Sequence, residues 1–295
     1  MTKTREFHAV LVFALLSCLF SWPFFFCADA WLEPMFSAQG NAEAARYAVL
    51  AGHILGMLGP ALAALFMWRA YHKESPPAWK WSSPRYYLFA ALAMLAFWGL
   101  PALIGLAFGD SLRSPIESGI WIRIAVLAVF GWIAGMGEET GWCAYVLPKL
   151  SGAAGKTRAA IVSSVIRGLW HWPVVVSPVI AQVAAGQRTV PELIGAGVVI
   201  ALQLVVSNFF FGPIFCWVWY KTESVPLTGW LHFWFDFVRD AAVMLLVGFG
   251  TGAWATQWNA FILLPAGFMF LSTILDDEGS GWRRFLGIGK SSLSK

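Results

Sequence analysis

The chain has 295 residues, of which 59% are hydrophobic and only 12% are charged. A soluble domain carries about a quarter charged residues, so this composition argues against soluble globular and disordered proteins. The apolar runs are long and continuous, unlike the short alternating segments of a transmembrane β-barrel. The formal net charge of +4 is too small to indicate nucleic acid binding. The composition therefore predicts an all-α, multi-pass integral membrane protein.

Hydropathy predicts eight membrane-spanning helices along the chain. They cover residues 8–29, 46–70, 86–108, 119–148, 158–182, 192–220, 225–248 and 254–275. No internal repeat, linker or cleavable signal peptide interrupts them, so residues 1–295 are expected to form a single polytopic membrane domain. Prolines inside the spans predict kinks or breaks at Pro23, Pro60, Pro101, Pro173 and Pro213.

Loop charges predict the orientation, because cytoplasmic loops are enriched in Lys and Arg. The N-terminus and the loops on its side carry Lys3, Arg5, His72, Lys73, Lys80, Arg85, Lys149, Lys156, Arg158 and Lys221, and the C-terminal tail carries Arg283, Arg284, Lys290 and Lys295. The opposite loops carry Glu33, Glu43, Asp110, Glu117 and Glu192, with Arg113 and Arg188 as their basic residues. We therefore expect both termini in the cytoplasm, most naturally at a bacterial inner membrane.

Five polar side chains lie inside these apolar helices. Glu138 and Glu139 are adjacent in the fourth span, His171 lies in the fifth, and His232 and Asp236 share one face of the seventh. A carboxylate at membrane depth costs a few kcal/mol or more, so it is retained where it does chemistry, carries ions or forms a pair. At about 1.5 Å per residue, the five lie about 12–20 Å from the cytoplasmic helix ends. We expect them to form one polar site buried in the helix bundle.

The chemistry that these residue types permit is the activation of water. A glutamate in a low-dielectric pocket beside a like charge can act as a general base near neutral pH, and a histidine can stabilise an oxyanion. The same residues could hold a divalent metal such as zinc, and the spacing does not decide between these alternatives. No HExxH or GxSxG motif is present, which argues against a zincin-type or serine hydrolase.

Three segments resemble the motifs of a known family. The run EETGWCAYVLPKL from Glu138 is similar to the first motif of the CPBP family, EExxxR. LWHWP at 169–173 is similar to the second, FxxxH followed by proline, and HFWFD at 232–236 to the third, HxxxN or HxxxD. These proteins are type II CAAX prenyl endopeptidases and bacteriocin-processing or immunity proteins. The resemblance covers a core at about 119–248.

The resemblance implies an eight-helix intramembrane endopeptidase that opens toward the cytoplasm. We expect no cofactor, with a divalent metal such as zinc as the alternative that the sequence leaves open. In such an enzyme Glu138 would activate water with the help of Glu139, and His171 would lie close to that water. His232 and Asp236 would form the oxyanion pocket. The implied partners are a peptide or protein substrate, which can be lipidated, and membrane lipids.

The chain departs from the family pattern at two positions. Cys143 stands where the first motif has arginine, and Arg167 stands where the second has phenylalanine. We hypothesise that Arg167 supplies the missing guanidinium from the next helix and pairs with Glu139. Replacing Arg167 by Phe should then abolish function, and adding Cys143→Arg should restore it.

Two further polar residues bear on the site. Asp236 stands where many relatives have Asn. An ionised aspartate cannot donate a hydrogen bond to an oxyanion, so Asp236 must either be protonated or orient His232. Asn208, inside the sixth span, is a supporting candidate that could hydrogen-bond to the site or make only a packing contact.

Two other functions fit the same residues. A non-catalytic immunity or regulatory membrane protein of this fold would keep the polar cluster without turnover, and the changes at positions 143 and 167 favour that alternative. An ion-coupled transporter would also use buried carboxylates and histidines, but no repeated halves or paired broken helices support it.

Overall fold

The computed structural model describes residues 3–107, 109, 111–112, 116, 118–247 and 266–275. These residues form helices and the segments that connect them, without a strand, and their only sheet-like contact is an isolated bridge between Leu112 and Leu246. The elements are α1 (Lys3–Phe26), η1 (Cys27–Leu32), α2 (Glu33–Ala38), α3 (Ala42–Met57), α4 (Gly59–Phe66), η2 (Met67–His72), α5 (Pro84–Ala107), α6 (Ser118–Glu139), η3 (Thr140–Val146), α7 (Leu147–Ala154), α8 (Lys156–Trp170), α9 (Trp172–Ala184), α10 (Val190–Thr222) and α11 (Val225–Leu245). The η segments are π-helical turns within longer helices. The predicted all-α class is confirmed.

Within the described residues, six helices are long and apolar enough to cross a membrane. They are Thr4–Ala38, Ala42–His72, Pro84–Ala107, Gly119–Ala154, Lys156–Ala184 and Val190–Thr222. They match the first six predicted spans and confirm a multi-pass membrane protein. The 21-residue α11 matches the seventh span, but it carries three charged residues, Asp236, Arg239 and Asp240.

The eighth predicted span is described only from 266 to 275, where a short apolar helix lies. Its residues 254–265 are outside the described part of the chain, as are Asp110, Arg113, Glu117 and the C-terminal tail with Arg283, Arg284, Lys290 and Lys295. The count of eight and the position of both termini therefore stay predictions.

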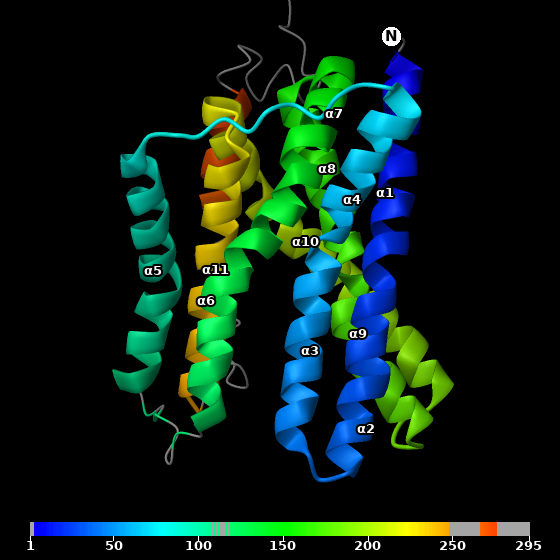
Figure 1. Cartoon of the computed structure of the whole chain (residues 1–295), viewed down its shortest axis with the longest axis vertical. Helices are drawn as coiled ribbons and strands as arrows, with labels where there is room; N and C mark the ends of the chain where they lie inside the picture. The colour runs from blue at the N-terminus through cyan, green and yellow to red at the C-terminus, as the bar shows by residue number, and fades with distance from the viewer. Residues whose placement is uncertain are drawn as a thin grey trace, which may run out of the picture.

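The helices form an elongated bundle with two distinct ends (Figure 1). The start of α1, the helix α7 and the connecting segment 73–83 lie at one end, and the turn between α2 and α3 lies at the other. Lys80 in this segment forms an ion pair with Glu223 after α10. The basic segments 73–83 and 149–158 thus lie at the same end of the bundle as the start of α1, in agreement with the charge pattern.

Two of the five predicted proline positions are true breaks. Pro60 and Pro173 lie in the first turns of α4 and α9, directly after interruptions at Leu58 and His171. Proline is accepted at this position because the first-turn N–H groups have no helical partner. Pro23, Pro101 and Pro213 instead lie inside helices that continue past them.

The close contact between α6 and α11 depends on two glycines. A Cβ atom on Gly135 would lie 2.7 Å from the carbonyl oxygen of Gly229, and one on Gly229 would lie 2.8 Å from the backbone of Met136. Any side chain at these positions would therefore push the two backbones apart. One turn further along, the same approach brings Glu139 of α6 next to His232 of α11.

We predict that Gly229→Ala lowers the unfolding temperature, because the new methyl group meets backbone that cannot move aside. The expected decrease in the free energy of unfolding is about 1–3 kcal/mol. The matched control is Gly152→Ala in α7, where a Cβ meets nothing within 4 Å and where alanine should be neutral or stabilising by up to about 1 kcal/mol. Thermal unfolding in detergent measures both variants, and equal behaviour of the two would contradict the close approach.

Candidate active site

The carboxylate of Glu139 is the centre of the polar cluster and is completely buried. Its Oε2 accepts hydrogen bonds from Nη2 of Arg167 at 2.7 Å and from the thiol of Cys143 at 2.9 Å. Its Oε1 lies 2.8 Å from Nδ1 of His232. Both oxygens are therefore used, and α6, η3, α8 and α11 meet at this one group.

Arg167 occupies the place that the sequence hypothesis gave it. Its side chain reaches from α8 to Glu139, and the predicted pair with that carboxylate is confirmed. The guanidinium lies between two aromatic rings, with its carbon 5.9 Å from the Trp142 ring centre and 5.2 Å from that of Phe215. Such faces stabilise a desolvated cation, which compensates part of the cost of burying this arginine.

Cys143 is held in place by the local backbone. The π-helical turn η3 begins directly after Glu139, and the hydroxyl of Thr140 donates to the carbonyl of Met136 at 2.7 Å. π-helical turns inside α-helices are frequent at functional sites. Here the turn keeps Cys143 against the carboxylate.

His232 lies between two carboxylates. Its Nδ1 faces Glu139, and its Nε2 lies 3.2 Å from Oδ2 of Asp236, one turn further along α11. The sequence left two roles open for Asp236. This contact fits the role of orienting His232. Asp236 is in turn held by Arg239, whose Nη1 lies 2.8 Å from Oδ1.

His171 and Glu138 form a second, looser part of the site. His171 lies at the break between α8 and α9, where its Nδ1 donates to the carbonyl of Arg167 at 2.8 Å. This leaves Nε2 directed at Glu138, 3.8 Å from Oε1. Oε2 of Glu138 is buried and makes no hydrogen bond to any described residue. Glu138 is thus the carboxylate of the cluster with capacity to bind something else.

The structure brings together Glu138, Glu139 and His232 closely enough for a metal, with donor atoms within 4.8 Å of one another. Two of these three are already saturated, because Glu139 binds Arg167 and His232 spans two carboxylates. A divalent cation would have to displace these contacts and sit beside a guanidinium. The donor set therefore fits a metal poorly in this arrangement.

Asn208 is buried, but its amide donates to the carbonyl of Leu204 in its own helix at 3.0 Å. Its Cβ lies 3.2 Å from the position of a Cβ on Gly168, so it packs against α8. Among the described residues its hydrogen bond does not reach the site, which favours the packing alternative.

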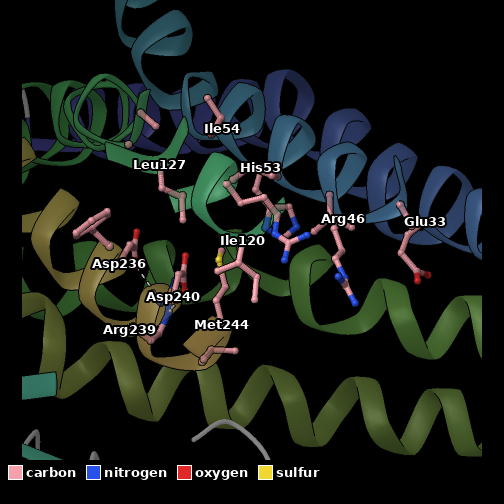
Figure 2. A pocket seen from close by; sticks show the side chains of 18 of the residues that line it. Glu33, Arg46, His53, Ile54, Ile120, Leu127, Asp236, Arg239, Asp240 and Met244 are labelled. Carbon is pink, nitrogen blue, oxygen red and sulfur yellow. Dashed lines mark hydrogen bonds and ion pairs between the residues drawn. The ribbon is translucent and has the colours of Figure 1, made fainter. Parts of the chain in front are cut away.

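A second intramembrane pair was not predicted from the sequence. Asp29 of η1 is buried, and its two oxygens lie 2.9 and 3.1 Å from Nε2 of His53 in α3. A signal was present, because both are ionisable residues inside predicted spans. His53 lines a cavity of about 870 Å³ between α3, α6 and α11, and Asp236, Arg239 and Asp240 face it from the other wall (Figure 2).

We predict that Arg167→Phe destabilises the protein by about 3–5 kcal/mol, because it leaves Glu139 as a buried charge with no cation beside it apart from His232. Adding Cys143→Arg should restore most of the stability by returning a guanidinium one turn from Glu139. Thermal unfolding of both variants measures this. An Arg167→Phe protein as stable as the wild type would contradict the importance of the pair.

One comparison with known proteins identifies a related family. Residues 119–238, from the start of α6 to late α11, match the family model of type II CAAX prenyl endopeptidase Rce1-like proteins. A search of curated proteins finds no match. The matched segment contains all three motifs, together with Cys143 and Arg167. Residues 119–238 are therefore similar to the type II CAAX prenyl endopeptidase Rce1-like family, in agreement with the protease family that the three motifs indicate.

Proposed function

We propose that the protein is an intramembrane endopeptidase in which Glu138 activates the water that hydrolyses a peptide bond. The observation that carries this proposal is the contrast between the two glutamates. Glu139 is saturated by three partners, whereas Glu138 keeps a buried oxygen without a hydrogen bond to any described residue. A carboxylate placed in this way can accept a proton from a bound water.

His171 completes the water site. Its Nε2 and Oε1 of Glu138 are 3.8 Å apart, which is too far for a hydrogen bond but suits one oxygen atom bonded to both. Glu138 would take a proton from that water while the oxygen attacks the peptide carbonyl carbon. The proton then passes to the departing amine as the carbon–nitrogen bond breaks, which regenerates the carboxylate.

Positive charge beside Glu138 would stabilise the oxyanion of the tetrahedral intermediate. Arg167 and His232 are fixed by their carboxylate partners, so they need not reorganise as charge develops. In this arrangement both ring nitrogens of His232 face carboxylates. Its contribution would then be electrostatic, and not a direct hydrogen bond to the oxyanion as the family resemblance implied.

The cavity between α3, α6 and α11 is the candidate path for the substrate. Its lining extends from Glu33 and Ala42, near the α2–α3 turn, to Asp236 at the cluster (Figure 2). The α2–α3 turn lies at the end of the bundle opposite to the start of α1 (Figure 1). The cavity therefore approaches the α2–α3 end of the bundle, and it does not support access from the predicted cytoplasmic end. Its mixed polar and apolar wall suits a peptide, with or without an attached lipid.

The test compares wild type with Glu138→Gln on a quenched fluorescent peptide library, using protein in detergent. We expect the variant to lose activity by about 10²–10⁴-fold, because it cannot accept the proton, while Glu74→Gln in the exposed 73–83 segment stays active. A chelator should leave the wild-type rate unchanged.

Other outcomes would point elsewhere. Loss of cleavage on chelation would favour a metal held by the Glu138, Glu139 and His232 donors. No cleavage by wild type, under conditions in which an active relative cuts the same library, would favour the non-catalytic membrane protein.

A further inference from the structure

The ionic contacts of the cluster form a single row in which positive and negative groups alternate. In each neighbouring pair, a side-chain nitrogen lies 2.7–3.2 Å from a carboxylate oxygen. The row runs from α8 through α6 and along α11, in the order Arg167, Glu139, His232, Asp236, Arg239, Asp240. Its last three members face the cavity, where Figure 2 shows Asp236, Arg239 and Asp240 side by side.

We propose that Arg239 is a positioning residue for the reaction, and that it acts through Asp236 on His232 and Glu139. This inference rests on the proposed function. Arg239 fixes Asp236, Asp236 fixes the His232 ring, and the ring occupies Oε1 of Glu139. Glu139 is thereby kept from competing with Glu138 for the water.

The geometry of Asp236 supports this role. Its two oxygens have separate partners, with Oδ2 toward His232 and Oδ1 toward Nη1 of Arg239. A carboxylate that has one oxygen fixed by a guanidinium cannot rotate without losing an ion pair. The direction in which it accepts from His232 is therefore set by Arg239.

Arg239 is itself held rigidly. Its Nε bonds to Asp240 at 2.7 Å, and its guanidinium carbon lies 5.9 Å from the Phe235 ring centre. Two acidic partners on different edges of the planar group define its orientation. The residue lies outside the three motifs, and two side chains separate it from Glu139, so it orients the site without touching the reacting atoms.

Arg239 also explains why an aspartate is tolerated in the third motif. Asparagine, which many relatives have at this position, is neutral and needs no counter-charge. Asp236 adds a negative charge inside a membrane-spanning bundle, and such a charge requires a partner. We therefore expect Arg239 to be needed only while position 236 is charged.

The test is a double-mutant cycle with Arg239→Gln, Asp236→Asn and the combined variant, assayed for peptide cleavage at saturating and limiting substrate. Arg239→Gln should lower kcat by about tenfold or more while KM changes little, because a displaced catalytic group loses rate and not binding. The kcat of Asp236→Asn is the reference for the double variant, because in that background Arg239→Gln should cost nothing further. Arg239→Lys should restore part of the rate, and Arg188→Gln, an exposed loop arginine, is the control.

Several results would overturn the proposal. They are an unchanged kcat in Arg239→Gln, a rise in KM alone, or a loss confined to folded yield with normal kcat per folded molecule. If Arg239→Gln does not fold, the comparison of Asp236→Asn with the double variant decides, and a further fall in kcat there contradicts the proposal.

A second readout does not depend on cleavage. Nuclear magnetic resonance of ¹⁵N-labelled histidine, assigned with a His232→Gln variant, reports whether both ring nitrogens of His232 carry protons. We expect two protonated nitrogens in wild type and a changed signal in Arg239→Gln. An unchanged signal overturns the positioning role, even if the wild type proves to be inactive on peptides and the proposed function fails.

Discussion

The pairing of Glu139 is the interaction on which the rest of the structure depends. A carboxylate without exposure inside a membrane protein is tolerated only when charge and hydrogen bonds compensate it, and here Arg167, Cys143 and His232 do so together. Because these partners come from three different segments, satisfying one side chain fixes the relative positions of α6, α8 and α11. Glu138, the adjacent residue, is then presented at a defined place with bonding capacity left over.

The second requirement is an irregular backbone at the right depth. His171 reaches Glu138 because α8 ends at Trp170, and such a break inside a membrane must have its freed polar groups satisfied by protein. The carbonyl of Trp170 accepts from the indole of Trp22 in α1 at 3.1 Å, and the indole of Trp170 donates to the carbonyl of Ser17 at 3.3 Å. The first helix, which lies outside the matched family segment, thus stabilises the break that positions His171.

Much of the site could be predicted because its signals are local or chemically exceptional. Adjacent glutamates in an apolar helix, a histidine followed by proline, and His232 and Asp236 one turn apart each restrict the possibilities severely. The Arg167–Glu139 pair was predictable because a buried arginine needs an acidic partner. Glu139 was the candidate, since position 143 lacks the arginine of the family motif. The helical class and the first six spans followed from hydropathy alone.

What was missed depends on how helices are rotated about their axes, which a single sequence does not specify. Asp29 and His53 are both visible as intramembrane ionisable residues, but nothing in their spacing says that they face each other. Arg239 and Asp240 are neighbours in the sequence, so their ion pair is local, but the second bond of Arg239, to Asp236, depends on a side-chain conformation. Asn208 has the polarity of a site residue, but its helix turns it toward α8.

The distances along the chain between the partners of Glu139 bear on how the protein is made. Arg167 follows Glu139 by 28 residues and His232 follows it by 93. At a synthesis rate of about 5–20 residues per second, α6 waits several seconds for its last partner. During that time its two glutamates face either lipid, at a high cost, or the interior of the insertion machinery. The helix that carries the chemistry is therefore poorly suited to entering the bilayer alone, and its stable insertion is coupled to the arrival of α8 and α11.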